Sequence, residues 1–215
     1  MSHGHETEPG AATGSASVVS AATAWVGITG NPASGRGESK RQVGRLVEAL
    51  RRHRLDARIA WTPGERAGLV AEATPGSGCR CLVAVGGDGT VAALVNDRPS
   101  VPITVLPAGT ENLFARHFGL KRDPARLAAT IDHGRVVPLD LGQIGARRFT
   151  LMAGIGFDAD VVTRHHAARH SRAGDPRPTH RLAYVEPVLR ASFEYRFPAL
   201  EVAVEIGRAS CRERV

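Results

Sequence analysis

Cysteine, aromatic residues and lysine are all scarce in this chain, and the first two scarcities each argue against a class of protein. Three cysteines in 215 residues do not make a disulfide scaffold, and Cys79 and Cys81 are too near in sequence for an easy disulfide. Aromatic residues make up 5% of the chain and are not interleaved with basic ones, which argues against a nucleic-acid partner. Only Lys40 and Lys121 are lysines, so arginine supplies almost all of the positive side of a net charge of +7.

Long hydrophobic runs are also missing. No stretch approaches the roughly 18 uncharged apolar residues that a membrane helix needs. Residues 1–24 are rich in small and polar residues and lack the basic start and apolar centre of a signal peptide, so we expect a disordered tail. The 42% of hydrophobic residues suits an α/β core, and reduced cysteines indicate a cytoplasmic protein.

The most informative stretch is Gly86-Gly87-Asp88-Gly89-Thr90. It directly follows the apolar run 81–85, which has the length and valine content of a buried parallel strand, and it precedes a predicted helix over 90–96. Small residues at a strand's carboxyl end let backbone N–H groups approach phosphate oxygens, and the helix directs its positive end to the same place. A carboxylate in such a loop is repulsive to phosphate unless Asp88 binds Mg²⁺ or handles a proton.

Two further loops have the same character. A predicted strand over 25–29 ends in Gly30-Asn31-Pro32-Ala33-Ser34-Gly35-Arg36-Gly37, and another over 101–106 ends in Pro107-Ala108-Gly109-Thr110-Glu111-Asn112. Each is followed by a predicted helix. Three such units place three loops at one edge of a sheet, where open α/β sheets bind ligands. A nucleotide-binding site at that edge is the prediction.

These residues carry a resemblance to a known family. Asn31-Pro32-Ala33-Ser34-Gly35, the Gly86–Thr90 motif, Gly109-Thr110-Glu111-Asn112-Leu113-Phe114-Ala115-Arg116 and Gly154-Ile155-Gly156-Phe157-Asp158 resemble, in order and spacing, the diacylglycerol kinase catalytic-domain family. The first glycine motif is shared with NAD kinases and phosphofructokinases, and the stretch after Gly109 narrows the resemblance to the lipid kinases. Many members carry Asp after the asparagine, where this chain has Leu113.

The resemblance implies ATP and Mg²⁺ as cofactors and a set of nucleotide-binding residues. Asp88 would be the catalytic residue, acting through Mg²⁺ or orienting the acceptor. The family's general base lies late in its second domain. Arg116 either neutralises phosphate or forms a salt bridge on a helix surface. The residues expected to hold the nucleotide are Asn31, Ser34, Gly35, Thr62, Gly86, Gly87, Gly89, Thr90, Thr110, Asn112 and Arg116.

The pattern changes after residue 135. Residues 136–141 and 148–153 predict two strands of an antiparallel hairpin, which by resemblance opens a β-sandwich-type second domain over 136–204 behind the Rossmann-like nucleotide domain of 25–135. Asp140 is as well explained by a turn as by a functional role, and Asp158 predicts a helix N-cap. Residues 163–181 predict a basic loop, in which His166 and His170 have zinc-ligand spacing without a third ligand.

Residues 205–215 resemble the translation of a common short-read sequencing adapter. We therefore expect the natural chain to continue differently after Val204, with the second domain incomplete and this fragment inactive. The predicted activity of the whole protein is transfer of the γ-phosphoryl of ATP to a lipid hydroxyl, such as that of diacylglycerol, at the inner face of the cell membrane. A soluble-substrate kinase of the NAD-kinase type and a non-catalytic nucleotide- or lipid-binding fragment are the alternatives. The sequence leaves the oligomeric state open.

Overall fold

The structure is a computed structural model that describes residues 24–32, 37–170 and 185–196. Its centre is a parallel sheet of β1 (Trp25–Gly30), β2 (Asp56–Ala60), β3 (Cys79–Gly86) and β4 (Ile103–Pro107), in the order β2-β1-β3-β4. The connecting helices are α1 (Glu38–Arg52), α2 (Pro63–Glu72) and α3 (Asp88–Asn96), and α4 (Leu113–His117) and α5 (Pro124–His133) follow the last strand. The predicted α/β fold is confirmed.

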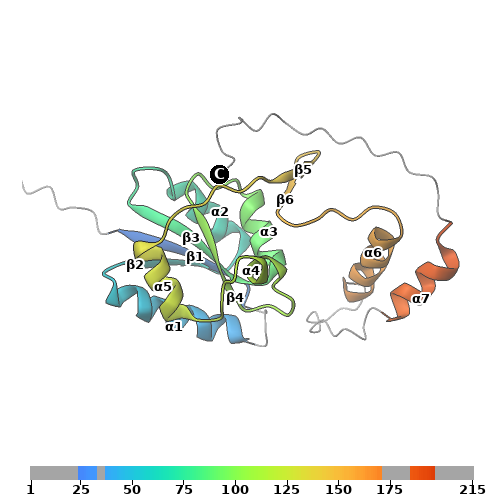
Figure 1. The fold of residues 1–215 in the computed structure, drawn as a ribbon, viewed down its shortest axis with the longest axis horizontal. Coiled ribbons are helices and arrows are strands. Elements are labelled where there is room, and N and C mark those ends of the chain that lie inside the picture. The colour runs from blue at the N-terminus through green and yellow to red at the C-terminus, as the bar shows by residue number, and fades with distance from the viewer. Residues whose placement is uncertain (1–23, 33–36, 171–184, 197–215) are drawn as a thin grey trace, which may run out of the picture.

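Helices cover both faces of the sheet (Figure 1). Successive strand residues point to opposite faces, so each strand contributes to two apolar clusters. In β3, Leu82 and Ala84 pack on the side of α2 and α3, whereas Val83 and Val85 pack on the side of α1 and α5. Because both faces are buried, β1 and β3 read as continuous apolar runs, which is why they could be recognised in the sequence.

The strand order contains a reversal that positions the site. The chain moves from β1 outward to β2, then crosses back over β1 to β3 and continues to β4. The loops after β1 and β3 therefore diverge to opposite faces of the sheet. Such a switch point opens a crevice at the carboxyl ends of the strands, where α/β proteins bind ligands.

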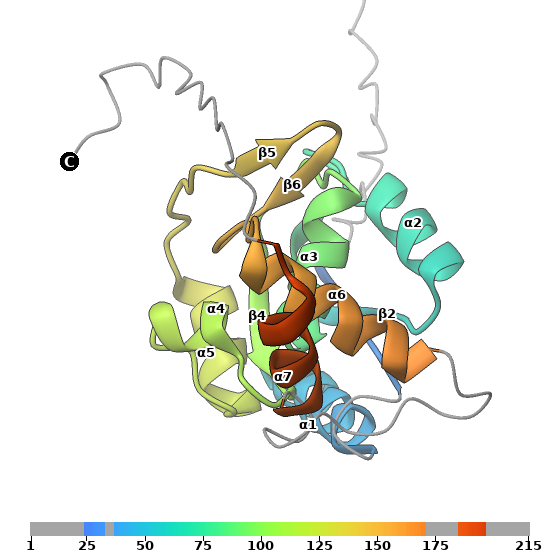
Figure 2. The ribbon, with the colours of Figure 1, turned by 90° about the vertical axis from the view of Figure 1, so that its right-hand side faces the viewer.

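The later part of the chain departs from the sequence predictions. Residues 136–141 form no strand, and the hairpin consists instead of β5 (Gly142–Ile144) and β6 (Arg147–Phe149), placed against the end of α3 by Asn96 (Figures 1 and 2). The Asn96 side chain donates to the carbonyl of Arg148 at 2.9 Å and accepts from its N–H at 2.9 Å. This contact joins positions 52 apart, so no local pattern announced it.

A helix was predicted to start near Asp158 and a loop to begin at residue 163, but the helix continues to residue 170 and a further helix follows at 185–194. α6 (Phe157–His170) packs on α7 (Val185–Glu194), and Arg164 joins them through its contacts to Asp160 and Glu194. Asp158 lies inside the first turn of α6 and is not its N-cap, so that prediction was wrong. The side chains of His166 and His170 lie outside the described part of the chain, as do residues 1–23 of the predicted N-terminal tail and the predicted adapter-derived residues 205–215. The division into domains at residue 135 stays a prediction.

The described helices include none with the length and apolar character to cross a membrane. Cys79 and Cys81 are free thiols, as predicted, and burial raises the pKa of Cys81 to about 12.

Candidate functional site

The predicted site residues come together at the carboxyl edge of the sheet. Asn31 follows β1, Thr62 follows β2, Gly87 and Asp88 follow β3, and Gly109 lies beyond β4. Because the four strands are parallel, all four loops meet at one edge. Ser34 and Gly35 fall outside the described residues.

Two helix N-termini at the switch point have no side-chain cap. Gly37 precedes α1 in the left-handed conformation (φ 88°), and Gly87 precedes α3; neither helix receives a capping hydrogen bond from its N-cap side chain. The N-termini of α2 and α5 are capped by Thr62 and Asp123. Uncapped first-turn N–H groups carry the positive end of the helix dipole and suit an anion. The arrangement at α1 and α3 therefore fits phosphate oxygens.

Glycines in the second and third loops are needed for different structural reasons. A Cβ on Gly109 would lie 2.5 Å from the Cα of Gly87, so the β3–α3 and β4–α4 loops touch backbone to backbone. A Cβ on Gly86 would lie 2.1 Å from the Thr90 hydroxyl. Gly87 itself has φ −100° and ψ −168°, an ordinary extended conformation that any residue can adopt. A glycine is favoured there by the close approach of Gly109 and not by the backbone angles.

Gly89 is the exception among these glycines. It is exposed in the first turn of α3, and a Cβ there would meet nothing within 4 Å. Only a ligand in the crevice could make a side chain at Gly89 unfavourable.

Asp88 contacts the next helix. Its two carboxylate oxygens accept hydrogen bonds from the backbone N–H groups of Leu113 (3.0 Å) and Phe114 (2.9 Å), the first two residues of α4. This satisfies two N–H groups that α4 cannot satisfy itself and places a negative charge at the positive helix end. Each oxygen retains a further lone pair, so the geometry is compatible with a cation ligand as well. The catalytic and Mg²⁺ roles of Asp88 stay predictions.

Asn112 closes the third loop on itself. It adopts the left-handed conformation (φ 50°, ψ 48°), which asparagine tolerates better than most residues. Its side-chain amide donates to the carbonyl of Gly109 at 2.8 Å, and its Oδ1 accepts from the N–H of Gly109 at 2.9 Å. These two bonds hold Gly109 against Gly87. Thr110 and Arg116 are exposed on either side of this turn.

Thr62 forms a capping box with Glu65. The Thr62 hydroxyl accepts from the Glu65 N–H at 3.2 Å, and the Glu65 carboxylate accepts from the backbone N–H groups of Trp61 (2.7 Å) and Thr62 (3.0 Å). Hydrogen bonds from these two backbone groups lower the pKa of Glu65, and the one from Trp61 has the larger effect. The hydroxyl predicted to contact nucleotide thus has a structural partner.

Sequence reasoning missed two residues that support the loops. Ser39 is fully buried, and its hydroxyl donates to the carbonyl of Val85 at 3.1 Å, which ties the start of α1 to the end of β3. Arg122 donates to the carbonyls of Pro107 (3.0 Å) and Gly109 (3.2 Å) and so supports the loop after β4. Both contacts join residues distant in sequence, and neither position belongs to a recognisable motif.

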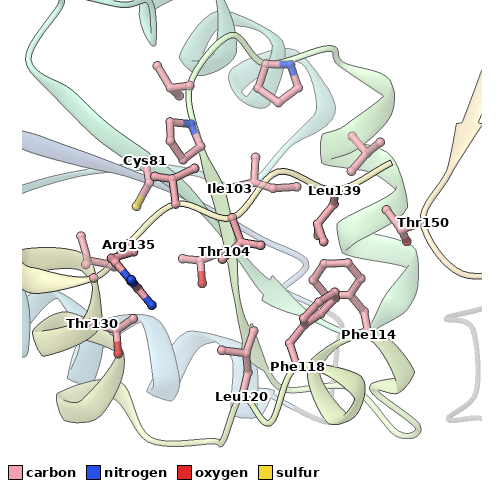
Figure 3. A pocket seen from close by; sticks show the side chains of 18 of the residues that line it. Cys81, Ile103, Thr104, Phe114, Phe118, Leu120, Thr130, Arg135, Leu139 and Thr150 are labelled. Carbon is pink, nitrogen blue, oxygen red and sulfur yellow. The ribbon is translucent and has the colours of Figure 1, made fainter. Parts of the chain in front are cut away.

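An apolar cavity of about 420 Å³ lies apart from these loops (Figure 3). It follows the outer edge of β4, with Leu139 beside Phe114 and Phe118 on one side and Thr130 and Arg135 on the other. None of the predicted nucleotide residues lines it.

A family model described as "Diacylglycerol kinase catalytic domain" matches residues 26–144, which is more than half of the chain. The chain belongs to the diacylglycerol kinase catalytic-domain family. The match includes all three loops and both uncapped helix N-termini. For this family, use of ATP and usually of a divalent metal is implied.

Curated relatives carry the same family character. The chain is 38% identical over 112 residues to a "Probable lipid kinase YegS-like" of Pseudomonas aeruginosa, covering 50% of this chain and 36% of that protein. A protein of the same name from Pseudomonas syringae pv. syringae is 39% identical over 114 residues, with 50% and 36% covered. The chain therefore spans about a third of the length of these relatives.

A solved structure supports the fold. The crystal structure of a diacylglycerol kinase from Bacillus anthracis str. Sterne matches with a TM-score of 0.52 at 24% identity, covering 67% of this chain and 51% of that one.

The residues at the sheet edge fit the cofactors that the family implies. ATP phosphates would lie at the N-termini of α1 and α3, where N–H groups have no side-chain cap. A divalent cation, which prefers oxygen ligands, would find the half-buried Asp88 carboxylate at the start of α3. That cation would neutralise charge on the phosphates.

Proposed function

We propose that the whole protein is a lipid kinase that transfers the γ-phosphoryl group of ATP to a lipid hydroxyl such as that of diacylglycerol, at the inner face of the membrane. The observation that carries the nucleotide half of the proposal is the pair of uncapped helices, α1 and α3, on opposite sides of the switch point. Family membership and the relatives named probable lipid kinases support the acceptor.

Each residue group has a role in this proposal. The N-termini of α1 and α3 bind phosphate oxygens, and the Gly87–Gly109 contact keeps the two loops at a fixed separation. Asp88 holds Mg²⁺ or orients the acceptor hydroxyl. Phosphoryl transfer depends mostly on positioning and charge neutralisation, so a rigid crevice of backbone donors and one carboxylate is suited to it.

The experiment follows labelled phosphate to its acceptor. Residues 1–215 are titrated with Mg-ATP by calorimetry. The protein carrying the genomic continuation after Val204 is given γ-labelled ATP with diacylglycerol in mixed micelles, and NAD in a parallel reaction. We expect ATP binding by the first and labelled phosphatidic acid from the second.

The other outcomes distinguish the alternatives. Label in NADP would identify an NAD-kinase-type enzyme. ATP binding without transfer to either acceptor would identify a nucleotide-binding module. Absence of ATP binding in both proteins would overturn the nucleotide site itself.

A further inference from the structure

Two histidines and an aspartate meet at the edge of the sheet opposite the glycine loops. His53 is the C-cap of α1, and Asp132 and His133 are the last two residues of α5. Because α1 and α5 pack side by side, their C-terminal ends converge there (Figures 1 and 2). None of the three belongs to a family motif identified above.

The ligand atoms of the three side chains are already gathered. The Oδ2 of Asp132 lies 2.9 Å from Nδ1 of His53 and 3.3 Å from Nδ1 of His133, and one atom from each residue falls within 4.8 Å of the others. Tetrahedral zinc with bond lengths near 2.0–2.2 Å separates its ligand atoms by about 3.4 Å. The longest distance between these ligand atoms can be shortened to that value by rotating the His133 side chain, which is 79% exposed.

The electrostatic setting also favours a cation. Two helix C-termini direct the negative ends of their dipoles at this point, and the Asp132 carboxylate lies between them. Positive charges also lie near this point. Arg51 and Arg52 stand in the last turn of α1. The Arg80 guanidinium donates to the carbonyl of Asp132, with a contact to that of Ile131 at 3.4 Å, and so uses its hydrogen bonds on backbone oxygens.

We propose that His53, Asp132 and His133 form a zinc-binding site that joins the end of α1 to the end of α5. Two imidazole nitrogens and one carboxylate oxygen are a typical zinc donor set, and the exposed side of His133 leaves the fourth position to water. On binding, each imidazole presents the Nδ1 lone pair to the metal and carries its proton on Nε2. The metal replaces the hydrogen bonds to Asp132 and stabilises the helix pair.

The test is a zinc titration of residues 1–215 with matched variants. We expect one zinc equivalent whose affinity falls at least about tenfold in His133→Gln and in Asp132→Asn. His117→Gln, a change of the exposed histidine of α4, should leave it unchanged. A hundredfold excess of zinc over its Kd should raise the unfolding temperature of the wild type by about 5 °C or more, and that of His133→Gln by less.

Cobalt provides a readout that does not depend on stability. Bound Co²⁺ should give visible absorption bands of a four-coordinate site in the wild type and in His117→Gln, and these should be lost in the His53→Gln/His133→Gln double variant. His133 is mostly exposed, so its single variant decides the matter if the double variant fails to fold. Zinc affinity and cobalt spectra that are the same in wild type and His133→Gln would overturn the site, as would absence of zinc binding.

Discussion

At the scale of single residues, Asp88 combines a structural contact with its predicted chemistry. Asp88→Asn removes the charge from the N-terminus of α4 and presents an amide donor to one of its two N–H groups, which should cost about 1 kcal/mol of unfolding free energy. Asp123→Asn removes a charge from the cap of α5, but its Oδ1 can still accept the single bond from the Arg126 N–H, so its stability should change little. We expect the larger stability loss in chemical denaturation, and a fall in lipid phosphorylation of orders of magnitude, for Asp88→Asn alone. Near-normal turnover in Asp88→Asn would contradict the catalytic assignment.

Gly89 allows the crevice to be probed without disturbing the fold. Gly89→Ala adds a methyl group that meets no protein atom, so stability should stay equal or rise by up to about 1 kcal/mol. If phosphate lies at the start of α3, the same methyl should weaken ATP binding, measured by calorimetry. Gly44→Ala, at an exposed and open position in α1, is the matched control and should leave ATP affinity unchanged. Equal ATP affinities in the two variants would show that ligand does not approach Gly89.

At the scale of elements, α2 tests whether Thr62 acts on the helix or on the nucleotide. Thr62→Ala removes the cap and should cost about 1 kcal/mol in chemical denaturation. Glu65→Ala breaks the same capping box but leaves the Thr62 hydroxyl in place. Loss of ATP affinity in Thr62→Ala alone would support the predicted nucleotide contact, and equal ATP affinity in both variants would restrict Thr62 to the helix start.

Three carboxyl groups at helix ends make the stability of the protein depend on pH. Hydrogen bonds from Gln42, from the Trp61 backbone and from His53 lower the pKa values of Glu38, Glu65 and Asp132, which are ordinarily 4.5, 4.5 and 3.8. A depressed pKa contributes stability above the unfolded value and loses it as the pH falls through the folded value. Unfolding free energy should therefore decline below about pH 4.5. In Glu65→Gln the unfolding free energy should decline less steeply with falling pH. An identical slope in the variant and the wild type would show that Glu65 does not contribute to the pH dependence.

The elements that could be predicted from the sequence are those with a strong local signal. β1 is buried throughout and β3 is buried from Cys81 onward because both faces of the sheet are covered, so both carry strongly apolar runs, and the glycine loops mark where the strands end. The supports of the loops and of the hairpin could not be predicted. Ser39 and Arg122 beside the loops, and Asn96 beside the hairpin, each bond a backbone group that only folding brings near. The second half of α6, from residue 163, was predicted as a loop because its basic and apolar residues do not separate onto two faces.

At the scale of the whole molecule, the α/β layers bury their apolar residues, whereas the later segments do not. Val136, Val137, Met152 and Phe193 are among the large hydrophobic side chains left exposed, Phe193 at 88%. Exposed apolar surface of this kind promotes association. We expect residues 1–215 to self-associate at micromolar concentration in sedimentation experiments, and Phe193→Ser to reduce the association.

Arg190→Ser provides the comparison on the same helix, because its exposed ion pair with Glu186 adds little stability. Association that is equal in Phe193→Ser and Arg190→Ser would exclude Phe193 as a contact. In a protein that carries the predicted natural continuation after Val204, we expect weaker association and lipid phosphorylation.

The hydrogen bonds from Asp88 to α4 couple ligand binding at Asp88 to the order of the first turn of α4. Asp88 belongs to the first turn of α3, yet its carboxylate holds the first turn of α4. Any ligand that draws the carboxylate away must release those two N–H groups, so its affinity is reduced by the free energy of that release. Linkage requires the converse as well: whatever secures α4 by other means strengthens binding at Asp88 by the same factor.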